Sequence, residues 1–155
     1  MQSNIKLFDT YSGYIFKRLY ENFPKCVNFE DVGKEVQSIE EEYGVLANLS
    51  LEEKVIIFSE TMLWLTNNGF IDFTHSYPNS KRPAQPMAYS NFLCISLTLK
   101  GLNLLTSPKP KSLNKHKKLG EEIVEKVKQG SLTEAGKLLT EGMFEFVIKK
   151  GFDNG

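Results

Sequence analysis

One segment constrains this fold more than any other: a helix with clear start and stop signals that passes directly into an alternating strand pattern. Residues 50–53, Ser-Leu-Glu-Glu, form a capping box, in which the Ser50 hydroxyl and the Glu53 carboxylate satisfy amides of the first turn. Apolar residues then recur at helical spacing until Asn67-Asn68-Gly69, a typical helix stop. From residue 70 the apolar period changes to two, which indicates a strand. The chain is therefore expected to combine helices with a small sheet.

The same periodicities predict the other elements. A first helix is expected to take Asp9 or Thr10 as its N-cap and to end before Pro24, and a brief strand should follow at residues 25–29. A second helix should begin at an Asp31 cap and end at Gly44. Further along the chain, the pattern predicts a hairpin of two strands (residues 70–77 and 93–97), a short helix (98–105) and two amphipathic helices after residue 118, separated by Gly130.

The order of these elements resembles a known fold. A helix ending in WLTNNGFI precedes the hairpin, and the last strand runs into ISLTLKGLNLL. These segments, with a Leu-x-x-x-Gly-hydrophobic step and a Leu-Thr-x-x-Gly-x-x-Leu-Leu stretch, are similar to those of winged-helix domains in bacterial regulators. The resemblance implies an α+β, mainly helical fold: a winged helix over residues 8–106 with a small antiparallel hairpin as its wing. A Lys-rich linker (107–118) and a C-terminal helical pair (119–151) would follow.

The composition limits the function classes. The 155 residues carry equal numbers of basic and acidic side chains, which argues against strong non-specific binding to nucleic acid. The charges are unevenly distributed, however, because nine acidic residues lie within residues 28–60 and five lysines within residues 107–118. Cys26 and Cys94 are interpreted as free, buried thiols in a reducing cytosol. Neither a signal peptide nor a membrane-spanning run is recognised, so a cytoplasmic protein is expected.

The third predicted helix offers a poor surface for DNA. Its polar positions fall into three wedges, of which one holds Glu53, Glu60 and Asn67 and another holds Lys54. Because this helix carries one lysine and three glutamates, it would place carboxylates next to the phosphates of DNA. Two readings of its apolar bands remain open: a fully packed core helix, or a docking surface for a protein partner. The candidate docking residues are Glu53, Ile57, Glu60, Trp64 and Asn67.

The basic residues favour a different contact. Lys81 and Arg82 lie in the predicted wing, where phosphate or minor-groove contacts are made in this fold. The linker adds five candidate nucleic-acid contacts: Lys109, Lys111, Lys115, Lys117 and Lys118. The alternative interpretation is that these basic side chains only form a solvated surface and contact no nucleic acid.

Three functions remain open at this point. The first is a non-enzymatic, regulatory interaction module that binds a protein partner or forms a homodimer through its C-terminal helix. The second is a DNA-binding regulator that uses the wing and linker, and the third is an immunity-type protein that binds a toxic nuclease through its acidic face. No catalytic residues, metal ligands or cofactor site are recognised: His75 and His116 are isolated, and consecutive glutamates at 40–42 cannot converge on one ion.

Overall fold

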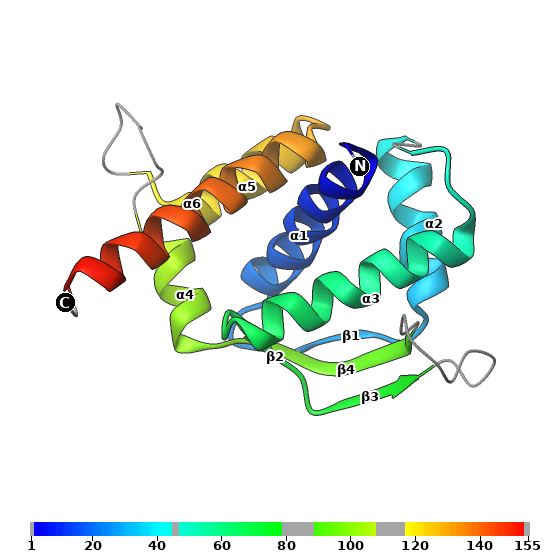
Figure 1. The fold of residues 1–155 in the computed structure, drawn as a ribbon, viewed down its shortest axis with the longest axis horizontal. Helices are drawn as coiled ribbons and strands as arrows, with labels where there is room; N and C mark the ends of the chain where they lie inside the picture. Colours follow the sequence, from blue (N-terminus) through cyan, green and yellow to red (C-terminus); the bar gives the residue numbers. More distant parts are fainter. Residues whose placement is uncertain (1, 45–46, 79–88, 108–116, 154–155) are drawn as a thin grey trace.

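The computed structural model describes residues 2–44, 47–78, 89–107 and 117–153. These residues form a mainly helical α+β fold of six helices and four short strands. In Figure 1 the strands lie along one edge of the molecule, α1 runs through its centre, and α5 and α6 lie together on the side of α1 away from α2. The helices are α1 (Gln2–Asn22), α2 (Val32–Tyr43), α3 (Leu51–Asn67), α4 (Leu99–Thr106), α5 (Leu119–Lys128) and α6 (Leu132–Asp153).

The small antiparallel sheet is organised around its longest strand. Every other strand pairs with β4, in the order β1-β4-β2, with β3 also hydrogen-bonded to β4. The expected hairpin is present, since both β2 and β3 pair with β4. Its first arm is not one continuous strand over residues 70–77, because Phe73 and Thr74 separate β2 from β3. The strands are β1 (Val27–Phe29), β2 (Ile71–Asp72), β3 (His75–Pro78) and β4 (Tyr89–Leu97).

The first helix is longer than its capping signals predict. It begins at Gln2, so Asp9 and Thr10 are interior helical residues and not N-caps. Both are buried by α6: the Thr140 hydroxyl donates to Asp9 Oδ1 (2.8 Å), and the Thr10 and Thr133 hydroxyls lie 3.1 Å apart. Their polar side chains therefore form contacts between α1 and α6 and do not cap the start of α1.

The caps of α2 and α3 follow the predicted chemistry, and Thr98, which was predicted as the first residue of the short helix, is the N-cap of α4. Asp31 Oδ1 accepts the Lys34 amide at 3.2 Å, Ser50 Oγ accepts the Glu53 amide at 3.2 Å, and the Thr98 hydroxyl accepts the Gly101 amide at 3.0 Å. Gly44 is the C-cap of α2, and Asn68 is the C-cap of α3. Local side-chain chemistry alone was sufficient to place these helix ends.

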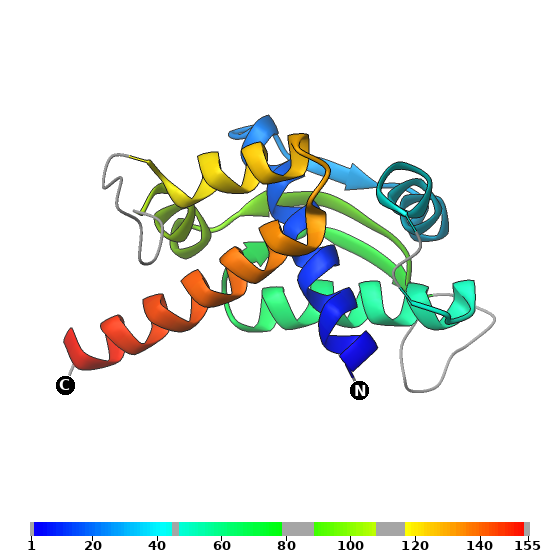
Figure 2. The same ribbon diagram turned by 90° about the horizontal axis from the view of Figure 1, so that it is seen from above.

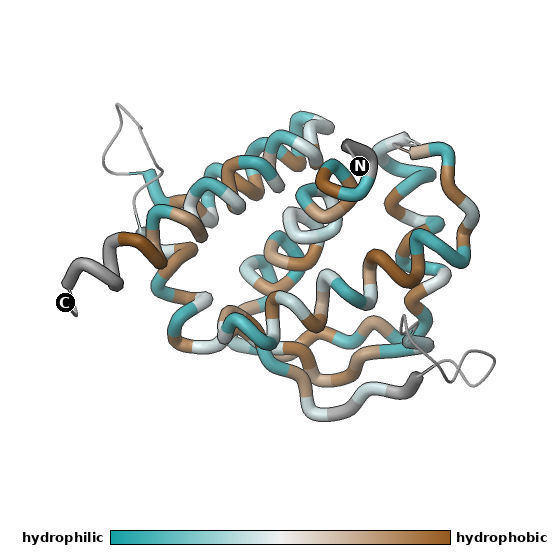
Figure 3. Tube along the Cα trace, viewed as in Figure 1, coloured by the Kyte–Doolittle hydropathy of each residue, from teal (hydrophilic) through white to brown (hydrophobic). Residues whose placement is uncertain are grey.

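The core lies between α1, α3 and the sheet. Phe29 and Phe58 are fully buried, with ring centroids 5.5 Å apart, and Tyr11 lies 5.3 Å from Phe58. Figure 3 shows hydrophobic segments recurring along α1, α3 and the strands. These aromatic contacts fix α3 on α1, so the orientation of the outer face of α3 is set by the core.

The register of β4 corrects the predicted alternation. Val27 pairs with Ile95 but Phe29 pairs with Phe92, so β4 contains one extra residue at this point. As a result Phe92 and Ile95 are buried, whereas the sequence pattern places Leu93, Ile95 and Leu97 on one face. The two cysteines are free but exposed, so the prediction that they are buried was wrong.

The C-terminal helices pack on the first helix of the same chain. Leu132, Ala135 and Leu139 of α6 are buried, and α6 crosses α1 where glycines lie on both sides. Figure 2 shows that the end of α6 extends beyond the rest of the fold. Phe144, Val147 and Ile148 in this part are exposed. None of the helices in the described part of the chain is long and apolar enough to cross a bilayer.

Candidate functional site

An open groove of about 660 Å³ lies between the N-terminal turns of α1 and the outer face of α3. One helical stripe of α3 provides much of its wall. Ile57, Glu60, Trp64 and Asn67 recur at spacings of three and four residues, which places them on one side of the helix. The described residues that line it are Asn4, Phe8, Ile56, Ile57, Glu60, Thr61, Leu63, Trp64, Asn67 and Tyr89.

Trp64 dominates the groove. Its side chain remains 44 % exposed, and its ring meets the edge of the Phe8 ring at a centroid distance of 5.2 Å and an angle of 85°. Of the two interpretations of this helix, the fully packed one is therefore wrong at Trp64, because α1 covers only part of the ring. The indole and Phe8 together form an aromatic surface that solvent reaches.

The far end of the groove is fixed by a hydrogen bond between α3 and the sheet. Ser59 is fully buried, and its hydroxyl accepts the backbone N–H of Tyr89 at 3.0 Å. This bond holds the first residue of β4 against α3, and Tyr89 also stacks on Phe92 with centroids 5.0 Å apart. The groove is therefore built on rigid elements at both ends.

Among the described residues that line the groove, Glu60 is the only charged one, and its side chain is exposed. The single lysine of α3 does not offset this charge. The sequence pattern places Lys54 in a polar wedge, but the structure buries it against α2, where its ammonium group forms an ion pair with Glu40. Thr61, in the same wedge, is also buried and donates its hydroxyl to the Ile57 carbonyl oxygen. The outer face of α3 is therefore acidic and apolar.

The structure brings four of the five predicted docking residues together in this groove: Ile57, Glu60, Trp64 and Asn67. Glu53 is exposed but does not line it. Phe8 was missed because the predicted helix took Asp9 or Thr10 as its N-cap and so began after Phe8, whereas α1 begins at Gln2. The spacing of Phe8, Tyr11 and Ile15 by three and four residues is the signal that would have included it.

Of the predicted nucleic-acid residues, Lys117 and Lys118 fall within the described part of the chain. Lys81, Arg82, Lys109, Lys111 and Lys115 lie outside the described residues. Lys117 is held by Glu122 (3.1 Å) and Glu125 of α5, and Lys118 is exposed immediately before α5. The hydrogen bonds to the two carboxylates raise the pKa of Lys117.

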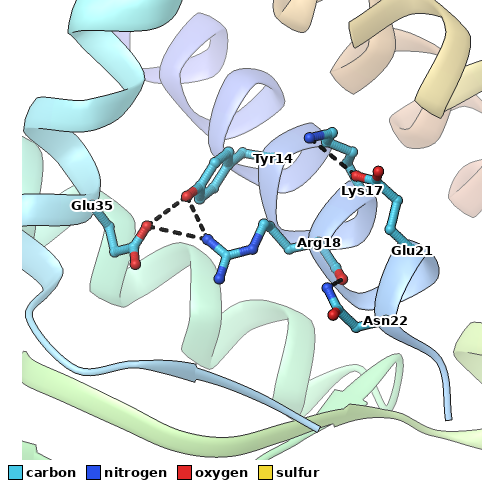
Figure 4. Close-up of polar contacts among 6 residues, drawn as sticks. All are labelled: Tyr14, Lys17, Arg18, Glu21, Asn22 and Glu35. Atoms are coloured by element: carbon cyan, nitrogen blue, oxygen red, sulfur yellow. Dashed lines mark hydrogen bonds and ion pairs between the residues drawn. The ribbon is translucent and has the colours of Figure 1, made fainter. Parts of the chain in front are cut away.

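A polar cluster joins α1 to α2 away from the groove (Figure 4). The Tyr14 hydroxyl donates to Glu35 Oε2 at 2.5 Å and accepts from Arg18 Nη1 at 2.7 Å. The guanidinium group also lies over the Phe29 ring, 5.4 Å from its centroid. Burial, reinforced by the Glu35 carboxylate, raises the pKa of Tyr14. Each polar group has a partner within the fold, which is the arrangement of a structural link between helices.

Among the described residues, no three His, Cys, Asp or Glu side chains converge as metal ligands would. Glu40 pairs with Lys54, whereas Glu41 and Glu42 are exposed. The side chain of His75 and all of His116 fall outside what the structure describes. Comparisons of the chain with protein-family models, with curated proteins and with solved structures give no match.

Proposed function

We propose that this chain is a winged-helix interaction module without catalytic activity, with a regulatory role, and that it binds a protein partner in the α1–α3 groove. The observation that carries the proposal is Trp64, a large aromatic side chain that stays 44 % exposed in an open groove lined by both apolar and polar residues. Aromatic residues of this kind commonly supply most of the free energy at protein interfaces. Such a surface on rigid helices is suited to recognition.

The winged-helix part of the proposal is supported by the packing of its two sequence motifs. The Thr98 hydroxyl donates to the Gly69 carbonyl oxygen at 2.5 Å while it caps α4. A Cβ atom on Gly101 would lie 2.0 Å from the Phe70 carbonyl oxygen, so only glycine allows this approach. The NNGFI and LTLKG segments therefore pack directly against each other. The sheet order β1-β4-β2 also agrees with a short first strand that adds to a hairpin.

The lining of the groove indicates the chemistry of its partner. Phe8, Ile57 and Trp64 offer apolar contact, and Glu60 is the one charged side chain beside them in the part of the lining that the structure describes. A complementary segment presents an apolar side chain to the aromatic surface and a Lys or Arg to the Glu60 carboxylate. We therefore infer a partner with a basic, amphipathic segment.

The DNA-binding alternative receives less support from α3. Three glutamates of this helix, Glu52, Glu53 and Glu60, are exposed, while Lys54 is turned inward. A helix in a major groove needs side chains that donate to bases and neutralise phosphates. That alternative now depends on Lys81, Arg82 and the linker lysines alone.

Site-specific photocrosslinking tests the groove as a docking surface. A photoreactive phenylalanine analogue replaces Asn67, at the edge of the groove, or Gln37, an exposed residue of α2, in the full-length chain. Irradiation in an extract of the native host is expected to give a discrete adduct from position 67 only. Equal labelling from both positions, or none from either, would contradict the proposal.

Matched variants then test the residues against the partner recovered. Trp64→Ala and Glu60→Lys are each expected to weaken binding by roughly tenfold or more, because they remove the aromatic contact and the charge. Phe144→Ala and Glu41→Lys are the controls, since they make the same kinds of change at exposed sites outside the groove. If Phe144→Ala abolishes binding or self-association while Trp64→Ala does not, the surface lies on α6 and the homodimer alternative is favoured.

A further inference from the structure

A second apolar surface lies near the end of α6. Phe144, Val147 and Ile148 are all exposed, and their spacing of three and four residues puts them on one side of the helix. Met143 and Phe146 of the same helix pack against the core, so the exposed residues form a separate face and do not continue the buried one. We call Phe144, Val147 and Ile148 the α6 stripe. Neighbouring exposed apolar side chains of this kind are typical of an interaction surface.

The end of α6 has the chemistry that complements the α1–α3 groove. The groove offers apolar side chains around Trp64 and, beside them, the exposed Glu60 carboxylate. Residues 144–150, Phe-Glu-Phe-Val-Ile-Lys-Lys, contain the α6 stripe together with two lysines and one glutamate. The end of α6 is therefore a basic, amphipathic segment, the kind of helix that docks in an acidic and apolar groove.

Within one chain these two surfaces do not meet. None of the described residues that line the groove belongs to α6, and Phe144 of the α6 stripe is 68 % exposed. Because α6 is one continuous helix packed against α1 at Gly136, this packing sets the direction of its end. The groove and the α6 stripe are therefore both available to a second copy of the chain.

Both surfaces face the same side of the molecule. In Figure 2 the N-terminal turns of α1, the helix α3 and the end of α6 all lie toward the lower edge of the view. A second copy related by a two-fold rotation would present its own groove and α6 end to the first, so that two identical contacts form together. Such an assembly closes after two chains.

We propose that this chain forms a two-fold symmetric dimer in which the α6 stripe of each copy occupies the α1–α3 groove of the other. Phe144 packs on the aromatic surface around Trp64, and the lysines at the end of α6 bring positive charge toward Glu60. The inference rests on the proposed function, because it takes the groove as a docking surface, and it adds the regulation of that surface. A dimer has no free groove, so self-association and binding of another protein exclude each other.

Sedimentation velocity of the purified full-length chain measures self-association in the absence of any other protein. Each contact involves little more than one helical turn, so we expect a Kd in the micromolar range, which runs from about 5 to 500 μM bracket. Wild-type protein should pass from monomer to dimer over this range, whereas Trp64→Ala and Phe144→Ala should stay monomeric. Leu99→Ala, at an exposed leucine of α4 outside both surfaces, is the control and should dimerise like the wild type.

Mixing the two monomeric variants shows which surfaces meet. Trp64→Ala keeps the α6 stripe and Phe144→Ala keeps the groove, so together they retain one of the two contacts. The mixture is expected to form heterodimers that are roughly tenfold or more weaker than the wild-type dimer, while neither variant associates alone. This recovery would also show that both variants are folded, because each supplies its intact surface.

The outcomes separate this dimer from the other assemblies. A wild-type chain that stays monomeric at about 500 μM, or a mixture that forms no heterodimer, would overturn the proposal. Dimerisation of Trp64→Ala at wild-type strength would also overturn it, since the contact would then join two α6 ends. The proposed function is judged separately: Phe144→Ala keeps its groove, so it should bind the protein cross-linked through position 67 in the host extract whether or not the wild type dimerises.

Discussion

A Cβ atom placed on Gly136 would lie 1.7 Å from the carbonyl oxygen of Asp9, so α1 and α6 cross where the backbones themselves are in contact. Gly13 faces this point from α1: its own Cβ would lie 3.0 Å from the Gly136 nitrogen. The absence of side chains on both helices permits the approach. The position of the C-terminal pair therefore depends on glycine at this crossing.

Gly136→Ala is expected to destabilise the fold by about 3 kcal/mol, because the methyl group must push one backbone away from another and cannot be relieved by a rotamer change. The gain in helix propensity, about 1 kcal/mol, only partly offsets this cost. Urea denaturation measures the difference. Gly142→Ala is the control in the same helix, since its Cβ would meet side chains and not backbone: Leu119 Cδ2 at 2.6 Å and Leu104 Cδ1 at 3.5 Å. Equal effects of the two variants would show that the close crossing is not needed.

Asp9 gives the fold a specific pH dependence. Burial is the largest influence on its pKa and raises it, although the Thr140 hydrogen bond and Lys137 act in the opposite direction. The folded state therefore holds the Asp9 proton more tightly than the unfolded state, and this contribution to stability is lost as the pH rises through the folded pKa. At neutral pH the ionised carboxylate costs stability.

Asp9→Asn removes this cost and can still accept the Thr140 hydrogen bond. We expect the variant to have a higher Tm than the wild type at pH 7, and the difference to shrink as the pH falls through the raised folded pKa of Asp9 toward the ordinary aspartate value of 3.8. Thermal melts across this range measure it. A lower Tm for the variant at pH 7 would mean that the charged contacts of Asp9 outweigh its burial.

The Lys54–Glu40 pair links α2 to α3 and is buried on the lysine side. Glu40→Ala leaves a buried ammonium group without its counter-ion and is expected to cost about 3 kcal/mol. Combining it with Lys54→Met should recover most of the loss, because the stem of the side chain still packs and no charge remains buried. Chemical denaturation of the single and double variants measures the coupling. Glu41→Ala, at the exposed neighbouring position, should change stability by less than about 0.5 kcal/mol.

A mobility-shift assay separates the protein-binding proposal from the DNA-binding alternative. The acidic outer face of α3 predicts no shift of a random duplex at micromolar protein and low salt, conditions that favour non-specific binding. A clear shift that disappears in the Lys81→Ala, Arg82→Ala variant would instead support contact through the predicted wing.

The features predicted correctly from sequence are those fixed by neighbouring residues. Asp31 and Ser50 cap their helices because the amide that each side chain accepts lies three residues along the chain. The stripe of Ile57, Glu60, Trp64 and Asn67 likewise follows from helical geometry within one element.

The features predicted incorrectly depend on partners far away in the sequence. Lys54 is buried because Glu40 of another helix faces it, and Asp9 lies inside a helix because α6 supplies Thr140. The exposure of Cys94 depends on an extra residue in β4 that is visible only in its pairing with β1. The spacing of residues within one segment cannot predict these contacts, because each one involves a residue from a distant part of the chain.

The shared position of α1 couples the two ends of the chain. Phe8 on one side of this helix lines the groove, while Asp9 and Thr10 contact α6. A ligand that holds Phe8 in place favours the states in which α1 is fully formed, and by thermodynamic linkage those are also the states in which α6 is docked. Ligand binding in the groove is therefore expected to slow amide hydrogen exchange in α6, a helix that the ligand does not contact.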